Sequence, residues 1–214
     1  PQWYTVAKRS RTYVAKVLSS ISGEYYKNYN VNRLKRRSNG IDLYYGDKSE
    51  FFSYDKVVLA SHADQALSII DEPTKEEQEI LSKFKYRENI AVIHTDESIM
   101  PNNKDIWSSW NSSVDKNNVE NNSITYWLNL LQNLDFNKNI FLTLNPNFKI
   151  NEDKILKKVN FTHPYFDQSA LDNQDKLKNL QNKKNLLFCG SYFGYGFHED
   201  GIKSSIEMIK AIDD

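Results

Sequence analysis

Cysteine is almost absent from this chain, and its scarcity excludes several kinds of protein. The 214 residues include one cysteine, Cys189, so an internal disulfide framework and a zinc site built from several cysteines are excluded. No run of about 18 apolar residues occurs, which argues against a membrane-spanning helix. The chain begins Pro1-Gln2-Trp3 and has neither the basic nor the apolar region of a secretory signal peptide. We therefore expect a cytoplasmic protein without an integral membrane segment.

Net charge is also absent, because 28 basic side chains balance 28 acidic ones. A balanced chain has no general attraction for nucleic acid or for an anionic membrane. The basic run Lys35-Arg36-Arg37 lies beside the hairpin signal Asn39-Gly40 and is interpreted as a solvated strand edge. The four histidines are scattered and lack the spacing of paired metal ligands. We expect neither a nucleic-acid partner nor a metal site.

Glycine is scarce too, but four of the seven glycines lie within twelve residues near the C-terminus. They belong to the run FCGSYFGYGFHEDGIKSS at 188–205, which follows a short apolar strand-like stretch. Glycine allows close approach of the backbone, so such a strand-to-helix connection can aim helix N–H groups at a ligand. Aromatic residues between the glycines can enclose a flat ring. The run predicts a cofactor site, although an ordinary turn before an ordinary helix is the alternative.

Two apolar runs predict strands that share one sheet with this loop. The apolar run at 56–60 predicts a strand buried on both faces, and the run at 186–189 predicts a second strand. Helices are expected over 61–70 and 168–182 from their apolar spacing. In such sheets a ligand lies at the carboxyl ends of the strands. The predicted site therefore combines the end of the first strand with the glycine-rich loop.

The block between these strands is rich in aromatic residues. Trp107, Trp110, Tyr126 and Trp127 either pack in the core and against a sheet or line an apolar substrate channel. His94 lies in a strand-like run and is expected to make structural hydrogen bonds. Low charge and many aromatic rings favour an apolar small-molecule substrate.

Several runs together carry a resemblance to a known family. They are PQWYTV at 1–6, DKVVLASHADQAL at 55–67, IHTDESIMP at 93–101, WSSWN at 107–111, TYWLNLLQ at 125–132, LTLNP at 142–146 and the run at 188–205. The chain resembles the flavin-containing amine oxidase superfamily, and more closely a bacterial subfamily of predicted NAD/FAD-binding, amine-oxidase-like proteins. The runs span nearly the whole chain, and the last is the most specific.

The resemblance implies an α/β fold with an α+β insertion, in which a partial FAD/NAD(P)-binding, Rossmann-like domain is joined to a mixed-sheet substrate domain. Residues 1–64 and 185–214 would form the FAD-binding part, and 65–184 the inserted substrate-binding domain. The fingerprint GxGxxG is absent from the chain. Family members carry it at their N-terminus, so the resemblance implies a C-terminal fragment whose partner is the missing N-terminal Rossmann segment.

The family's contacts with the nucleotide and the sugar chain of FAD carry over to five positions. Backbone groups near Val31 would face the adenine. Ala60 and Ser61 would lie beside the cofactor, at the carboxyl end of the strand predicted over 56–60. Gly190, followed by Ser191, would lie near the pyrophosphate and the ribityl chain.

The family's contacts with the flavin ring carry over to five further positions. Main-chain N–H groups of Glu199 and Asp200, with Gly201 after them, would face N1 and O2 of the isoalloxazine. A helix N-terminus there would stabilise negative charge on the reduced ring. Tyr195 and His198 would form the wall that faces the substrate.

The function that the resemblance implies is an FAD-dependent oxidoreductase, which transfers a hydride from a substrate C–H bond to flavin and is reoxidised by oxygen or another acceptor. The family usually has an acidic residue where this chain has Ser191-Tyr192, and no lysine is assigned beneath flavin N5, so amine oxidation stays open. One alternative is a flavin-dependent desaturase or isomerase of an unsaturated lipid. The other is a truncated or split chain that acts as a non-catalytic binding module.

Overall fold

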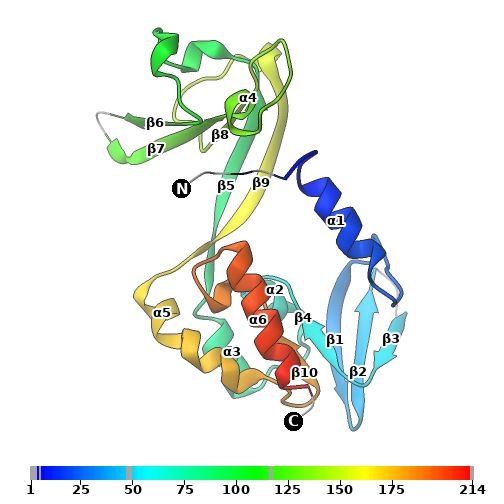
Figure 1. The fold of residues 1–214 in the computed structure, drawn as a ribbon. Helices are drawn as coiled ribbons and strands as arrows, with labels where there is room; N and C mark the ends of the chain where they lie inside the picture. The colour runs from blue at the N-terminus through cyan, green and yellow to red at the C-terminus, as the bar shows by residue number, and fades with distance from the viewer. Residues whose placement is uncertain (1–3, 5, 47–49, 116–117, 213–214) are drawn as a thin grey trace. The chain divides into compact units, whose positions relative to one another are not determined.

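The computed structural model describes residues 4, 6–46, 50–115 and 118–212 (Figure 1). The α-helices are α1 Ser10–Ser19, α2 Ala63–Ile69, α3 Lys75–Leu81, α4 Leu128–Leu131, α5 Gln168–Gln174 and α6 His198–Lys210. The strands are β1 Val31–Arg37, β2 Gly40–Tyr45, β3 Phe51–Tyr54, β4 Val57–Leu59, β5 Lys85–His94, β6 Trp110–Asp115, β7 Asn118–Trp127, β8 Phe141–Leu144, β9 Ile155–Tyr165 and β10 Leu186–Phe188. The 3-10 helices are η1 Glu97–Ile99, η2 Lys104–Ile106, η3 Glu152–Lys154, η4 Asp175–Leu180 and η5 Ser191–Phe193. Over the described ranges, no helix has the length and apolar character to span a bilayer.

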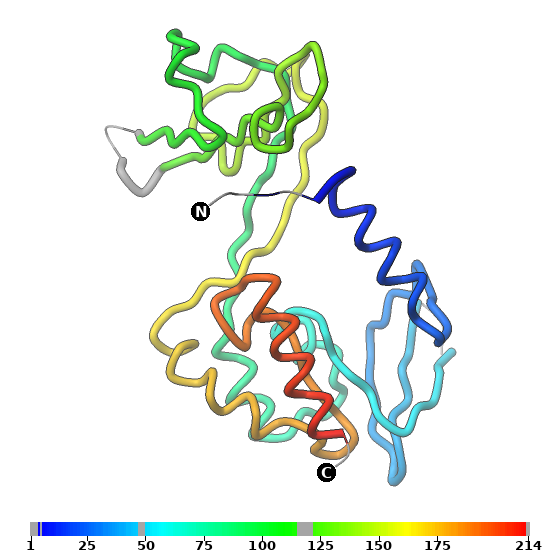
Figure 2. The backbone as a smooth tube through the Cα atoms, in the orientation of Figure 1, coloured from blue at the N-terminus to red at the C-terminus, as the bar shows by residue number. Residues whose placement is uncertain are grey.

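The chain forms two compact units. Unit 1 comprises Pro1–Tyr25 and Glu88–Thr162, and unit 2 comprises Tyr26–Arg87 and His163–Asp214. Strands β5 and β9 carry the chain out of unit 2 and back into it (Figure 2). The mixed α/β fold with its inserted sheet is confirmed. These limits differ from the boundaries expected after residues 64 and 184, and the division into a cofactor domain and a substrate domain stays a prediction.

An antiparallel sheet of three strands, β1-β2-β3, opens unit 2. The Asn39-Gly40 hairpin is confirmed, because Arg37 pairs with Gly40 across the turn. The basic triplet lies at the end of β1, which is an edge strand of this sheet, and Lys35 pairs there with Asp42. Lys35 and Arg37 are exposed, as predicted for a solvated strand edge. Because strand side chains alternate between faces, Arg36 turns inward and forms an ion pair with Glu77 of α3.

Strands β4 and β10 form a parallel pair, with Leu186 opposite Val57 and Phe188 opposite Leu59. This confirms that the two apolar runs share one sheet. The expectation that the first strand is buried on both faces was wrong, because Val58 is 40% exposed. The physical reason is that α6 packs on β10 and not on β4. Met208 of α6 contacts Leu187 in a small separate cluster, while Val58, which pairs with Leu187, stays uncovered.

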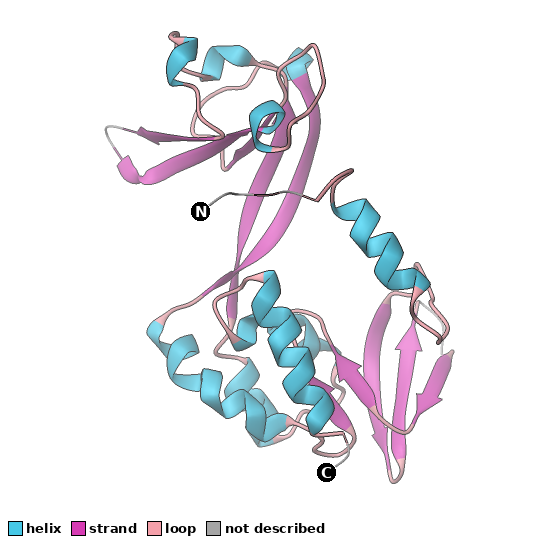
Figure 3. Ribbon diagram, in the orientation of Figure 1, coloured by secondary structure: helices cyan, strands magenta, loops and turns pink. Residues whose placement is uncertain are grey.

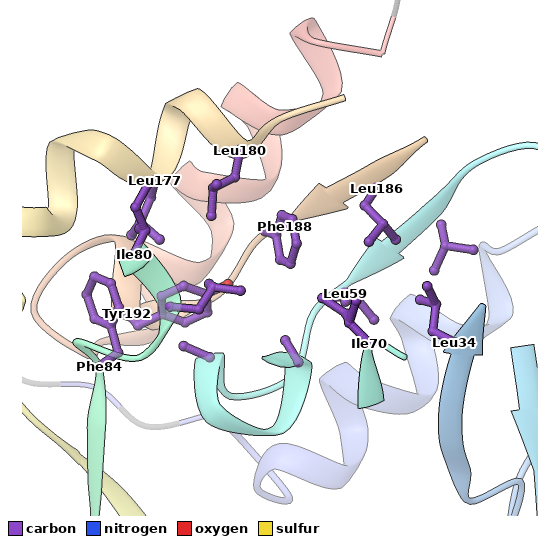
Figure 4. Packing of buried hydrophobic residues seen from close by; sticks show 14 of the residues in the cluster. Leu34, Leu59, Ile70, Ile80, Phe84, Leu177, Leu180, Leu186, Phe188 and Tyr192 are labelled. Atoms are coloured by element: carbon purple, nitrogen blue, oxygen red, sulfur yellow. The ribbon is translucent and has the colours of Figure 1, made fainter. Parts of the chain in front are cut away.

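Helices α2, α3, α5 and α6 gather around this pair of strands (Figure 3). Side chains from β1, β4, β10, α3 and η4 meet in one core, as Figure 4 shows. The helix expected over 168–182 is α5 followed by the turn η4, whose Leu177 and Leu180 are fully buried while Leu171 is exposed. Burial of each such leucine contributes about 1.5–3 kcal/mol.

The outer edge of β10 is closed by a side chain rather than by a strand. The Gln181 amide accepts from Phe188 N–H at 3.0 Å and donates to Phe188 O at 2.8 Å. A paired edge does not recruit another chain, so Gln181 protects the strand from edge-to-edge association.

Unit 1 is built on a five-stranded sheet in the order β6-β7-β8-β5-β9. The pattern at 105–111 predicts a strand, but β6 begins only at Trp110 because η2 precedes it. The polar composition of 116–122 predicts a loop, but this run belongs to β7 from Asn118 onward, and residues 116 and 117 lie outside the described part of the chain. Pro164 predicts the end of a short strand at 159–163, but β9 continues through this proline to Tyr165. β9 lies at the edge of the sheet, where the missing N–H of proline is tolerated.

A polar network lies inside unit 1. His94 is fully buried, as the prediction of a structural role requires, and its Nδ1 accepts from Asp96 N–H at 3.2 Å. That bond places the ring proton on Nε2, which lies 2.9 Å from Thr143 Oγ1. The Thr143 hydroxyl in turn lies 2.9 Å from that of Thr125. Burial lowers the pKa of His94, and the nearby Asp96 opposes this effect only in part.

The buried His94 makes the stability of unit 1 sensitive to pH. A lowered pKa in the folded state means that the unfolded chain takes up the proton first. The free energy of unfolding should therefore be constant above about pH 6.5 and fall as the pH decreases below it, by at most about 1.4 kcal/mol per pH unit. Urea titrations between about pH 7.5 and 5.0, followed by tryptophan fluorescence, measure this slope. All four tryptophans, at 3, 107, 110 and 127, belong to unit 1 and unit 2 contains none, so the signal reports on unit 1.

A His94→Gln variant should lose this slope, and the exposed His163→Gln should keep it. An unchanged slope in His94→Gln would assign the pH dependence to another group.

Candidate cofactor site

A cavity of about 620 Å³ lies beside β4 in unit 2. Three of the residues predicted to bind the cofactor, Val31, Ala60 and Ser61, are together in its lining. They come from the start of β1 and the end of β4. The full lining is Asn30, Val31, Asn32, Leu43, Val57, Val58, Leu59, Ala60, Ser61, Gln65, Ser68 and Ile69, none of which is charged.

The free edge of β4 gives this cavity main-chain polar groups. Val57 N–H donates to Asn185 O and Cys189 N–H donates to Leu59 O, so residues 57 and 59 turn their polar groups toward β10. Along a strand these groups alternate in direction, so those of Val58 and Ala60 face the other side. Among the described strands, only β10 pairs with β4. A ligand in the cavity therefore meets a row of N–H and C=O groups.

A β-bulge shapes the opposite wall of the cavity. The pairing of β1 with β2 shifts between Val31 and Arg33, so Asn32 is the extra residue. Its side chain donates to Gly46 O at 2.5 Å, while Gly46 N–H donates to Asn30 O at 3.0 Å. These two bonds fix the start of β1 in spite of the interrupted ladder. A bulge redirects the backbone, and here it lies next to the residue predicted to face adenine.

The turn between β4 and α2 is held by Tyr86. The Tyr86 hydroxyl accepts from Ala63 N–H at 2.9 Å, and its ring stacks on His62 at 4.2 Å. Burial raises the pKa of Tyr86 to about 12, so the hydroxyl stays neutral at physiological pH. Ser61, which lines the cavity, therefore belongs to a turn whose next two residues, His62 and Ala63, are both held by Tyr86.

The glycine-rich loop approaches this turn through Gly190. A Cβ atom at Gly190 would lie 2.7 Å from Tyr192 Cε1 and 3.6 Å from Ser61 O, and φ is 156°. Gly190 N–H donates to Ser204 Oγ of α6 at 2.9 Å, and that hydroxyl lies 2.8 Å from Gly201 O. The carboxyl ends of β4 and β10 and the start of α6 are thus held together, as the sequence predicted.

Asp200 organises the loop before α6. Its carboxylate accepts from Tyr195 N–H at 3.0 Å and from Phe197 N–H at 2.9 Å, and this caps the helix. A Cβ atom at Gly194 would collide with that carboxylate, so glycine is required there. The Asp200 N–H donates to Phe197 O at 3.1 Å. The sequence did not reveal this capping role, and the predicted contact of Asp200 with a flavin ring stays a prediction.

The other predicted residues do not line the cavity beside β4. Asp200 and Ser204 line a second cavity of about 440 Å³ between η4 and α6. Tyr195 is 72% exposed, and His198 is exposed at the first position of α6. The predicted residues that line neither of these two cavities are Gly190, Ser191, Tyr195, His198, Glu199 and Gly201.

Among the lining residues that were not predicted from the sequence, three come from α2. Gln65, Ser68 and Ile69 lie on one face of α2 and border the cavity. Their spacing of three and four residues was the signal that could have found them, because such residues share a helix face.

Comparison with known proteins supports the fold. No family model matches the chain, and no curated protein sequence matches it. Among solved structures, a CLA-producing fatty acid isomerase from P. acnes is similar with a TM-score of 0.63 and 14% identity, over 95% of this chain and 51% of the isomerase. Putrescine oxidase gives 0.62 and 10%, over 96% and 52%. A proposed protoporphyrinogen oxidase from Exiguobacterium gives 0.69 and 8%, over 95% and 51%.

At these identities the likeness concerns the fold alone. The chain spans about half the length of each of these solved proteins. Over that length its fold is similar to the folds of these solved proteins.

Proposed function

We propose that this chain is part of an FAD-dependent oxidoreductase of the amine-oxidase-like type, and that the cavity beside β4 receives the adenosine end of FAD. The observation that carries the proposal is the meeting of Val31, Ala60 and Ser61 in one cavity with a free strand edge. Residues from β1 and β4, separated in sequence, form one wall each. A cofactor that spans both walls accounts for their arrangement.

The lining fits a flat, neutral heterocycle with a polar edge. Val31, Leu43 and Ile69 offer aliphatic surface to its faces, and the backbone of Val58 and Ala60 offers donors and acceptors to its edge. The absence of charged groups from the lining fits adenine better than phosphate. When bound, the flavin supplies the acceptor for a hydride from a substrate C–H bond.

The remaining roles in the proposal belong to the glycine-rich loop and α6. Gly190 lets the end of β10 approach the Ser61 turn, and Asp200 holds the start of α6 in place. In the proposal, Tyr195 and His198 form the wall that faces the substrate. An N-terminal Rossmann segment outside these residues supplies the rest of the FAD site, and the single buried cysteine, Cys189, suits a cytoplasmic protein.

A flavin-dependent isomerase or desaturase of an unsaturated lipid is the second candidate function. One of the similar structures is a fatty acid isomerase, and unit 1 has an exposed apolar sheet face that suits a hydrocarbon substrate. This reading needs no amine chemistry, in keeping with Ser191-Tyr192 where the family usually has an acidic residue.

The proposal is tested by the visible absorption spectrum of the protein purified from its complete reading frame. The wild type is expected to show the bands of oxidised flavin. An Ala60→Phe variant adds a ring inside the cavity beside β4, so its affinity for FAD should fall about tenfold or more. Equilibrium titration with FAD measures the change.

The matched control is Ala15→Phe, which adds the same ring at an exposed position of α1. It should leave FAD binding unchanged. Wild-type protein that is colourless and takes up no added FAD would remove the proposal, and equal affinity in both variants would remove the assignment of the cavity.

A further inference from the structure

The three-stranded sheet of unit 2, β1-β2-β3, has one face on the core and one face outside (Figure 1). Leu34 of β1 and Ile41 of β2 are 0% exposed and belong to the core. Side chains alternate along a strand, so the residues next to these two lie on the opposite face. Strand pairing defines that face, which we call the outer face, as Arg33, Lys35, Arg37, Asp42, Tyr44, Phe51 and Ser53.

Three cationic side chains form a row along β1 on the outer face. Arg33, Lys35 and Arg37 stand at alternate positions of the strand, and all three are exposed. Alternate residues of a strand are about 7 Å apart, so the row is about 14 Å long. Arg36, which lies between two of them in the sequence, turns to the other face and pairs with Glu77. The outer face therefore carries an evenly spaced row of positive charges.

These charges are only partly compensated within the chain. Asp42 is the acidic member of the outer face, and its Oδ1 accepts from Arg37 Nε at 2.8 Å and from Ser53 Oγ at 2.7 Å. Lys35 stands opposite Asp42 in the sheet but forms no ion pair with it. Among the described residues, no carboxylate forms an ion pair with Arg33 or Lys35. Two positive charges of the row thus remain available to a ligand.

An aromatic pair holds the first cation of the row. The Arg33 guanidinium carbon lies 4.0 Å from the centre of the Tyr44 ring, and the rings of Tyr44 and Phe51 are 5.1 Å apart. A guanidinium stacked in this way is preorganised to donate from its edge to a carboxylate. Phe51 is 49% exposed and offers an apolar contact beside it. Because Arg33 lies over the Tyr44 ring, the pair does not offer two free rings to successive bases of a nucleic acid.

The spacing and size of the outer face select the kind of ligand. In an extended peptide, side chains on one side are also about 7 Å apart, so carboxylates at every second residue match the row. Three strands about 4.8 Å apart and a row about 14 Å long give an area on the order of 130 Å². A stable interface between folded proteins needs about 800 Å² per partner. The face therefore suits a short extended segment rather than a folded surface.

We propose that the outer face of the β1-β2-β3 sheet binds an extended acidic segment of a partner protein, with a carboxylate at every second residue. Arg33 and Lys35 face two of these carboxylates, and Arg37 stands at the end of the row. The zero net charge of the chain does not oppose this binding, because the row is a local concentration of charge. The inference goes beyond the proposed function and requires neither flavin nor substrate.

The test is fluorescence anisotropy of a labelled peptide, with blocked ends and glutamate at three alternate positions, mixed with the protein from its complete reading frame. The wild type should bind the peptide saturably and more weakly as salt is added. Lys35→Glu reverses the charge at the middle of the row and should weaken binding about tenfold. A peptide of the same composition with glutamate at every third position turns its middle carboxylate away, so it should bind about threefold more weakly.

The matched control is Lys157→Glu, which makes the same charge reversal at an exposed position of strand β9, outside the outer face. It should bind the peptide as the wild type does. No saturable binding by the wild type, equal affinity in Lys35→Glu and Lys157→Glu, or equal affinity for the two peptides overturns the proposal. Tighter binding to single-stranded DNA or to phosphatidylserine vesicles than to the peptide also overturns it. A protein that takes up FAD but does not bind the peptide rejects this proposal alone.

Discussion

Replacement of Glu77 by alanine is expected to destabilise unit 2 by about 3–5 kcal/mol. The Glu77 side chain is 2% exposed and forms an ion pair with Arg36, whose own side chain is 15% exposed. Its second oxygen accepts from Thr74 N–H at 2.7 Å and so caps α3. Alanine would leave the Arg36 guanidinium buried without its counter-charge, and the helix start would lose its capping box. Urea unfolding followed by far-UV circular dichroism measures the loss.

The same helix provides the control for Glu77. Glu79 forms an exposed pair with Lys75 at 3.7 Å, so Glu79→Ala should cost no more than about 0.5 kcal/mol. Because an apolar pair can replace a buried ion pair at little cost, the double variant Arg36→Met with Glu77→Leu should recover most of the stability. A loss below about 1 kcal/mol in Glu77→Ala would show that Arg36 finds another counter-charge or reaches water.

Gly190→Ala is expected to destabilise unit 2 by about 2–4 kcal/mol and to weaken cofactor binding with it. The new Cβ would overlap the ring of Tyr192, which is 2% exposed and packs against Phe84 and Phe193. Neither the ring nor the strand can move away cheaply, because Ser204 holds the Gly190 N–H. The two readouts are the urea midpoint and the affinity for FAD.

Gly23→Ala is the control for Gly190, because nothing lies within 4 Å of the position of its Cβ. It should be neutral, or stabilising by up to about 1 kcal/mol. If Gly190→Ala were equally neutral, the strands and Tyr192 would have to be free to move, and the fixed junction between β10 and β4 would be disproved.

Local sequence predicted the elements whose signals lie within a few residues. Asn39-Gly40 predicted the hairpin because its turn needs only those residues and the strands beside them. The apolar run at 186–188 predicted β10 for a similar reason, since a short, fully buried strand needs no polar alternation. The glycines near the C-terminus predicted a close junction between β10 and α6, which Gly190 and Ser204 form.

Long-range contacts account for the errors. Val58 is exposed because α6 packs on β10 and not on β4. The residues near Val58 in the sequence do not indicate which strand a distant helix covers. β9 continues through Pro164 because it is an edge strand, and position in a sheet depends on partners far along the chain. The expected helix at 168–182 changes to a 3-10 turn after Gln174, so that Leu177 and Leu180 both reach the core.

By itself, then, the sequence determined the hairpin at Asn39-Gly40, the short buried strand at 186–188 and the places where its glycines permit close approach, because these depend on neighbouring residues. Only the tertiary structure decided that Val31, Ala60 and Ser61 share a cavity, since their meeting requires β1 and β4 to fold against one another. It also decided which tryptophans are buried. Trp107 and Trp110 are three residues apart in the sequence. The pairing of β6 with β7 leaves Trp110 66% exposed, whereas Trp107 packs against Phe141.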